Sequence, residues 1–376
     1  MNLRRAGFVA LEVVLVAAVP VLGWVGFRTV LDTTEGQAVD PELDPNEPGY
    51  EAFLEPTPLA LPQGLDDGGD LSWLTVVGLG GPQEQGGSVL FIPVATLTED
   101  GRETLAEVRA EDGERALAAA VGELLDAGFA DVVTVAPGRV ADLVAPVAPI
   151  ELRLADDVEG FDTGDVALDP DEVAALLLAR DEAESDLNRL ARQEAVWRAW
   201  LGAIAASSDP GAVPGETGSG LGRYVRGLSL GAVAYDTAPV EVVDAEATDE
   251  EGEVFEADVE ALRALVADRI PFPVADRPGG RVRVRVLDAV GVEGLSLLVA
   301  RDAVRAGGQV TVIGNADAFG RETSRVTFFD GAVAADAAAV AAALGIGSVE
   351  QLPGPNPDDL VDVTVVVGSD LAAAYR

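Results

Sequence analysis

LSWLTVVGLGGPQEQGGSVLFIP, at residues 71–93, sets two β-prone apolar runs on either side of a glycine-rich turn. Runs this short, rich in Val, Leu, Ile and aromatic residues and bounded by Gly and Pro, are typical of buried strands. The pattern predicts strands at 71–79 and 88–93. Everything downstream is interpreted outward from this pair.

Helical and strand-like patterns alternate after residue 93. Apolar residues recur at helical spacing over 114–125, 140–147, 170–179, 184–206 and 259–267. Shorter β-prone runs occupy 132–135, 150–154, 225–234 and 240–243. Strands that alternate with helices favour an α/β sandwich, in which helices cover one sheet. We expect this α-β-α domain to span 71–275.

A second, smaller domain is predicted at 281–372, after a proline-punctuated linker. Strand patterns at 282–287, 310–313, 325–329 and 361–367 frame helical patterns at 294–306 and 334–344. The order β-α-β-β-α-β in so short a chain is typical of a small split α/β domain, ferredoxin-like or similar.

The N-terminus carries the pattern of a membrane anchor. Residues 6–27 are apolar except for Glu12, and Arg4 and Arg5 precede them. A helix of this length spans a bilayer core, and the positive-inside rule puts its short end in the cytoplasm. Residues 1–28 are therefore predicted to be a single-pass transmembrane anchor, with the bulk extracytoplasmic; a cleaved signal peptide is the alternative. Residues 29–70 lack basic side chains and are rich in Pro, Gly, Asp and Glu, which predicts an extended stalk.

Composition excludes several kinds of chemistry. The chain has no cysteine and no histidine, so disulfides, thiolate nucleophiles and Ser-His-Asp triads are impossible. All its positive charges are arginine, which also excludes a P-loop lysine. A net charge of −40 argues against a nucleic-acid partner. It indicates either a solvated acidic surface or a surface that attracts cations and basic partners.

Residues 281–371 resemble the C-terminal domain of actinobacterial LytR-type proteins. The resemblance is carried by VRVLDAVGVEGL at 284–295, GGQVTVIGNAD at 307–317, the strand at 326–329 and VDVTVVVGSDL at 361–371. Asp288 stands where an asparagine is usual. Gly291 and Gly294 suit a strand-to-helix turn, which favours a packing role over phosphate binding.

The first domain resembles the LytR-CpsA-Psr (LCP) catalytic domain, for which the resemblance implies transfer of a glycopolymer from a polyprenyl pyrophosphate carrier to peptidoglycan. Four stretches carry it in order: SVLFIPVAT at 88–96, VVTVAPGRVADLVAPVAPIELRL at 132–154, LDPDEVAALLLAR at 168–180 and DLNRLARQ at 186–193. The last matches the family signature Asp-x-x-Arg-x-x-Arg-Gln. This resemblance implies an anionic-headgroup site formed by Arg180, Asp186, Arg189, Arg192 and Gln193.

Several positions depart from that family pattern. Val94 and Ala95 replace the family arginine and aspartate, and Trp73 falls near the acidic residue of its first strand. Leu178 replaces one of two paired helix arginines. Phosphoryl transfer depends on positioned positive charge and a metal ion, so these losses predict a domain without catalysis and without a cofactor.

Two functions from different classes follow. The first is a non-catalytic cell-envelope protein that binds a glycopolymer, a polyprenyl (pyro)phosphate carrier, peptidoglycan or a protein partner. The second is an active phosphotransferase that uses Mg²⁺ at a site rebuilt from residues such as Asp156, Asp157, Arg180 and Arg189. A third hypothesis is a purely structural spacer that binds no small molecule. Arg189 and Arg192 lie three residues apart and hence on one helix face, where they bind a headgroup or pair with Glu184 and Asp186. Trp197 and Trp200 belong either to the core or to a lipid tunnel.

Overall fold

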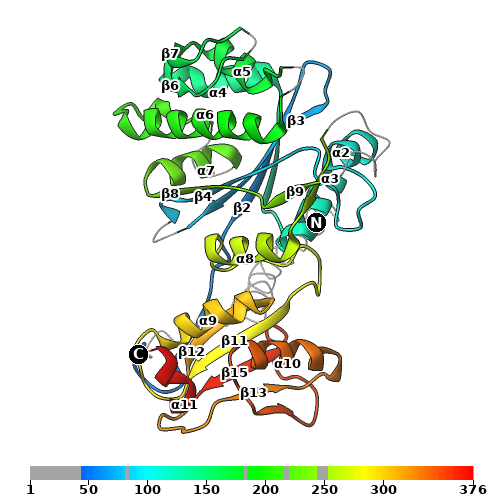
Figure 1. Cartoon of the computed structure of the whole chain (residues 1–376). Coiled ribbons are helices and arrows are strands. Elements are labelled where there is room, and N and C mark those ends of the chain that lie inside the picture. The colour runs from blue at the N-terminus through cyan, green and yellow to red at the C-terminus, as the bar shows by residue number, and fades with distance from the viewer. Residues whose placement is uncertain are drawn as a thin grey trace, which may run out of the picture.

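The computed structural model describes residues 44–80, 84–158, 160–181, 184–215, 220–243 and 253–375. They form two α/β domains, one above the other in Figure 1. The predicted anchor at 1–28 lies outside the described residues, as does the stalk up to residue 43. No helix in the described ranges is both long and apolar enough to cross a bilayer.

The first domain is built on a mixed five-stranded sheet in the order β5-β2-β3-β4-β8. Its two central pairs, β2–β3 and β3–β4, are antiparallel, and the outer pairs β2–β5 and β4–β8 are parallel. The strands are β2 (Leu59–Leu65), β3 (Leu71–Leu79), β4 (Gly87–Ile92), β5 (Asp131–Val135) and β8 (Val233–Thr237). The two strands predicted from the opening motif are thus neighbours, and both are almost wholly buried.

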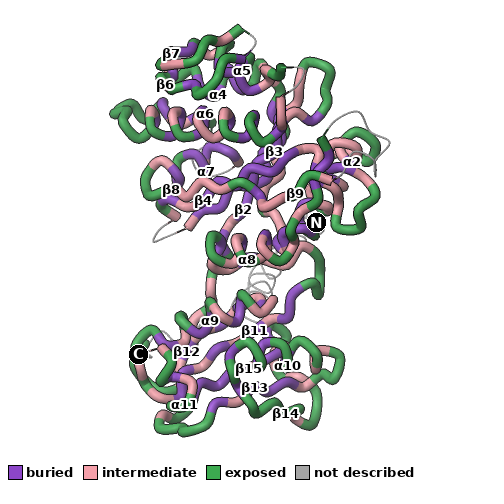
Figure 2. The backbone as a smooth tube through the Cα atoms, viewed as in Figure 1, coloured by how far each residue is buried: buried purple, intermediate pink, exposed green. Residues whose placement is uncertain are grey.

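Helices cover both faces of this sheet, as the sandwich prediction requires (Figure 1). One apolar core lies under α4 (Pro137–Val144), α5 (Pro170–Leu178), α6 (Asp186–Ala206) and α7 (Gly220–Ser229). A second core lies under α2 (Leu105–Asp112), α3 (Glu114–Leu125) and α8 (Val259–Arg269). Two small antiparallel ribbons flank them, β6 (Ile150–Leu154) with β7 (Gly164–Leu168) and β9 (Val240–Val242) with β10 (Phe255–Ala257). Figure 2 shows buried residues concentrated along the sheet.

The strand predicted at 225–234 was wrong. The first half of that stretch belongs to helix α7, and only its last two residues enter β8. Leu221, Tyr224 and Leu228 recur at helical spacing and are all buried. The β-prone residues misled the assignment because tertiary packing of this apolar face outweighs their local preference.

The C-terminal domain has a six-stranded sheet in the order β1-β12-β11-β15-β13-β14. β11, β12 and β15 are mutually parallel, so the domain is a split α/β sheet rather than an antiparallel ferredoxin-like one. Its elements are β1 (Glu51–Phe53), β11 (Val282–Asp288), α9 (Leu295–Arg305), β12 (Gly308–Asn315), β13 (Arg325–Phe328), α10 (Ala334–Ala343), β14 (Val349–Gln351), β15 (Val363–Val367) and α11 (Ser369–Ala372). α9 and α10 contribute to the core on one face of the sheet.

The stalk prediction was wrong for residues 51–65. Strand β1 joins the C-terminal sheet and β2 joins the first one, so the first domain starts at Leu59 rather than at residue 71. The proline content of this stretch suggested a segment without strand pairing. The stretch is paired nonetheless, and the pairing of β2 with β3 has an interruption between Ala60 and Gln63. Pro62 falls in this gap, where its missing N–H breaks no bond to β3.

Candidate functional site

Helix α6 carries the residues that sequence analysis assigned to an anionic-headgroup site. Ser185 caps the helix by accepting a hydrogen bond from the backbone N–H of Leu187. Asp186, Arg189 and Gln193 follow at spacings of three and four residues, and all are buried on one helix face. These three residues of the signature therefore point into the domain.

Asp186 and Arg189 form a buried ion pair, with 3.1 Å between the guanidinium Nη1 and the carboxylate Oδ1. The other guanidinium nitrogen, Nη2, donates to the carbonyl oxygen and to Oγ of Ser72, at 3.1 and 3.0 Å. Arg180 lies further out, with its Nη2 3.7 Å from Asp186 and its side chain half exposed. The helix start is thereby tied to the start of β3.

Arg192 is held by a different set of acceptors. It forms a two-pronged ion pair with Glu184, and its Nη2 also donates to the carbonyl oxygen of Ala179 at 2.7 Å. Burial alone would raise the pKa of Glu184, but the hydrogen bonds and charge of Arg192 lower it overall. The carboxylate is therefore the charged partner of Arg192 at neutral pH.

The replaced family motif lies at the same end of the sheet. β3 and β4 pair antiparallel up to Leu74 and Ile92, and Val94 follows in a turn in which the backbone N–H of Thr96 donates to the carbonyl oxygen of Pro93. Ala95 accepts a backbone hydrogen bond from Phe255 at 3.1 Å, and the side chain of Glu253 accepts one from the backbone N–H of Asp186 at 3.3 Å. Residues 253–255 thus join the segment after β4 to the start of α6. The side chain of Val94 packs into the core under α2, α3 and α8.

Carboxylates of the protein itself pair with the arginines of this cluster. Arg192 pairs with Glu184, and Arg180 and Arg189 share Asp186. An incoming pyrophosphate would have to displace these carboxylates before it could bind the guanidinium groups. This arrangement favours the helix-pinning alternative over a preformed anion site.

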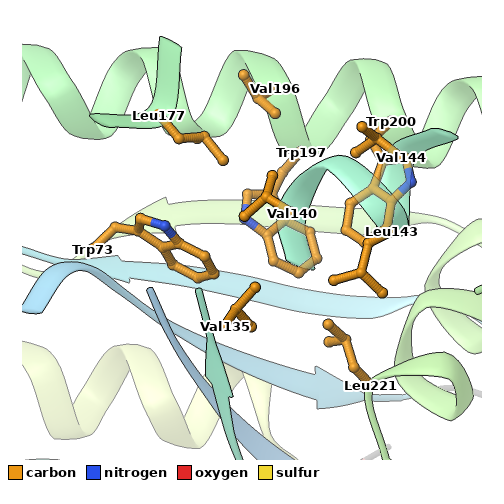
Figure 3. Close-up of a pocket in the computed structure, with 10 residues that line it drawn as sticks. All are labelled: Trp73, Val135, Val140, Leu143, Val144, Leu177, Val196, Trp197, Trp200 and Leu221. Atoms are coloured by element: carbon orange, nitrogen blue, oxygen red, sulfur yellow. The ribbon is translucent and has the colours of Figure 1, made fainter. Parts of the chain in front are cut away.

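An apolar cavity lies next to the cluster, between the sheet and helices α4 to α7 (Figure 3). Trp73, which follows Ser72, lines it together with Trp197 and Trp200; the three indoles lie in a row. Trp197 and Trp200 have ring centroids 5.4 Å apart and are both buried. The cavity volume is only about 30 Å³, close to that of one liquid water. The tryptophans therefore fill core space here and leave little room for a lipid tail.

Gln193, like Arg189 and Arg192 at their Nε atoms, has a buried polar atom without a hydrogen-bond partner. Its side chain is buried, and its Oε1 has no hydrogen-bond partner. It lies one helical turn before Trp197, between the charged cluster and the cavity-lining part of α6. A buried acceptor without a donor is costly, which makes Gln193 the natural place for a ligand hydroxyl or a water molecule to donate.

The structure separates the acidic residues proposed for a rebuilt metal site. Asp156 lies beside Arg192 in a shallow hollow of about 90 Å³, whereas Arg180 and Arg189 share Asp186. Asp157 accepts a 2.6 Å hydrogen bond from the backbone N–H of Thr163. Within the described part of the chain, no three acidic side chains come close enough to hold a metal ion.

Sequence reasoning missed two contributors to this site. Ser72 and Glu253 lie far from α6 in the chain, and neither belongs to a recognisable motif. Only the strand pairing brings them to Asp186 and Arg189. No signal in the sequence alone could have identified them.

Comparison with known proteins agrees with the resemblances drawn from the sequence. Residues 281–371 match the family described as LytR cell envelope-related transcriptional attenuator, which confirms the predicted LytR C-terminal domain. No curated protein matches the chain.

Similar solved structures include TagV of B. subtilis, which is 17% identical, with a TM-score of 0.46 over 59% of this chain and 100% of that one. TagT bound to LIIa-WTA is 18% identical, with a TM-score of 0.47 over 62% and 94%. The LytR-CPS2A-psr family protein YwtF (TagT) with bound octaprenyl pyrophosphate lipid is 16% identical, with a TM-score of 0.45 over 62% and 94%.

Proposed function

We propose that this chain is a membrane-anchored, extracytoplasmic cell-envelope protein of LCP type, and that its first domain binds an envelope glycopolymer without transferring it. The apolar run at 6–27 supports the anchor, and the LytR match at 281–371 supports the cell-envelope setting. The buried ion pair of Arg189 with Asp186 carries the non-catalytic part.

The reason is electrostatic. Phosphoryl transfer needs unpaired positive charge aimed at the transferring group, usually with a metal ion. Here the guanidinium groups of Arg189 and Arg192 form ion pairs with carboxylates of the protein. The residues at the two motif positions, Val94 and Ala95, are apolar. The binding part rests on the unpartnered oxygen of Gln193 beside the cluster, which suits a hydroxyl-rich ligand such as a glycan.

Incubation of the full chain with a polyprenyl-pyrophosphate-linked glycopolymer tests this function. We expect retention of the glycopolymer on immobilised protein and no release of polyprenyl phosphate or pyrophosphate, with or without Mg²⁺. Gln193→Leu should weaken retention, whereas Gln85→Leu, a surface substitution in the same domain, should not. Membrane fractionation of cells that express the full chain tests the anchor.

The outcomes separate the candidate functions. Turnover by the unsubstituted chain that disappears in Arg180→Ala would establish the rebuilt phosphotransferase instead. Absence of both binding and turnover would leave only the hypothesis that the protein is a structural spacer.

A further inference from the structure

The chain that precedes the first domain is an integral part of the last one. Strand β1 pairs antiparallel with β12, in the register Glu51 to Gly314 and Phe53 to Val312. The backbone N–H of Asn315 donates to the carbonyl oxygen of Tyr50 at 2.7 Å. Further bonds extend this contact on both sides, from Leu54 N–H to Thr311 and from Gly49 N–H to Ala316, each at 3.0 Å. We call residues 44–54 the strap.

Two residues of β12 are fitted to receive the strap. Gly314 lies so close to it that a Cβ would be 2.1 Å from the carbonyl oxygen of Tyr50. The side-chain amide of Asn315 donates to the carbonyl oxygens of Pro45 and Glu47, at 2.8 and 2.7 Å. Both residues belong to GGQVTVIGNAD at 307–317, one of the stretches that carries the LytR resemblance. That motif therefore has a binding role here that neither the sequence nor the family match assigns.

The chain passes between the two domains at two places, and hydrogen bonds join these two connecting segments. Thr57 donates its backbone N–H to the carbonyl oxygen of Phe272 at 2.8 Å and accepts the N–H of Phe272 at its Oγ1 at 3.1 Å. Beside them the buried guanidinium of Arg281 lies 2.9 Å from Oδ2 of Asp126 in the first domain. The first domain is thus inserted between β1 and β11, and the two segments that connect it to the C-terminal domain are hydrogen-bonded to each other.

We propose that the C-terminal domain is a strand acceptor that captures the strap of its own chain, and that it thereby attaches the N-terminal segment to itself rather than to the first domain. An edge strand that takes up an extended segment gains affinity from main-chain hydrogen bonds and specificity from side-chain fit. The chain thus contributes to the C-terminal domain at residues 51–53 before it enters the first domain at Leu59. The position of the C-terminal domain next to a membrane rests on the proposed anchor; strand capture does not.

Cysteine pairs in this cysteine-free chain test the capture. Phe53 and Val312 form a pair without reciprocal hydrogen bonds, the geometry in which side chains of antiparallel neighbours come closest. The full chain carrying Phe53→Cys and Val312→Cys should form an intramolecular disulfide under mild oxidation, detected as a monomer with altered mobility on a non-reducing gel. The control pair Phe53→Cys with Leu230→Cys, the second being exposed in the first domain, should stay reduced. Failure of the first pair to close would refute the proposal, and disulfide-linked dimers would show that the strap is exchanged between copies.

A second measurement uses no cysteine. Gly314→Ala should push the strap off β12 and raise amide hydrogen exchange of residues 50–54 at least tenfold, together with cleavage by a glutamate-specific protease at Glu47 and Glu51. Gly347→Ala, at a site with no atom within 4 Å, is the matched control and should change neither. Unchanged exchange in Gly314→Ala would overturn the proposal. A chain that closes the disulfide but does not fractionate with membranes would refute the anchor and leave strand capture standing.

Discussion

The indole of Trp73 packs directly over Gly64 of the neighbouring strand, so closely that a Cβ at residue 64 would lie 1.8 Å from the ring. This contact fixes the indole at the end of the apolar cavity that faces Ser72 and Arg189. The position at which the family resemblance expects an acidic side chain is thus filled by a locked aromatic ring.

Gly64→Ala should therefore destabilise the first domain. The added methyl group forces the Trp73 indole out of its place, and overpacking of this kind costs about 1–3 kcal/mol. Gly202→Ala is the matched control, because this helical glycine has no atom within 4 Å of its Cβ position and should gain up to about 1 kcal/mol. Urea unfolding followed by tryptophan fluorescence measures both; equal free energies of unfolding for the two variants would contradict the locked indole.

Removal of the Arg189 side chain should be far more costly than removal of an exposed arginine. Arg189→Ala leaves the carboxylate of Asp186 buried without its cation, which costs about 3–5 kcal/mol. Arg139→Ala breaks an exposed pair with Asp142, 3.8 Å apart, and should cost at most about 1 kcal/mol. Chemical denaturation of both variants tests this. A small loss for Arg189→Ala would mean that Asp186 already has another cation, with Arg180 the nearest candidate.

The Glu184–Arg192 pair should make stability sensitive to acid. The folded-state pKa of Glu184 lies below its ordinary value of 4.5, so its stabilising contribution is present above that pH and disappears as the pH falls through the folded pKa. At neutral pH, Glu184→Gln should unfold at lower urea concentration than the unsubstituted chain, and the gap should close in acid. A difference in unfolding urea concentration that stays constant from neutral pH down to well below 4.5 would exclude the Glu184 carboxylate as the source of the acid sensitivity.

Salt should stabilise the whole chain. A net charge of −40 makes the folded state repel itself, and the Debye length shrinks to about 3 Å at 1 M salt, which screens that repulsion. We expect the Tm to rise steadily between low salt and about 1 M NaCl. A non-ionic osmolyte at matched osmolarity serves as the control, and an equal rise in that osmolyte would point to solvent exclusion instead of charge.

The helices and most strands were predictable because their periodicity is local. The predicted strand at 71–79 matches β3, and the pattern at 184–206 differs from α6 only at its start. The errors fall where distant parts of the chain decide. Helix α7 was mistaken for a strand, and β1 and β2 were assigned to a stalk, because only packing against partners elsewhere in the chain reveals their roles.

By itself the sequence determined the two α/β domains, the family likeness of the second, and the exclusion of cysteine, histidine and lysine chemistry. It also predicted a helix over 184–206 that carries the signature residues at 186–193, which α6 confirms apart from its first two residues. Only the tertiary structure decided how Arg189 is held, because its acceptors include Ser72, which β3 brings from a remote part of the chain. The tertiary structure also decided that Tyr50 and its neighbours belong to the C-terminal domain. An edge strand pairs through backbone hydrogen bonds, and these produce no periodic pattern of side chains in the sequence.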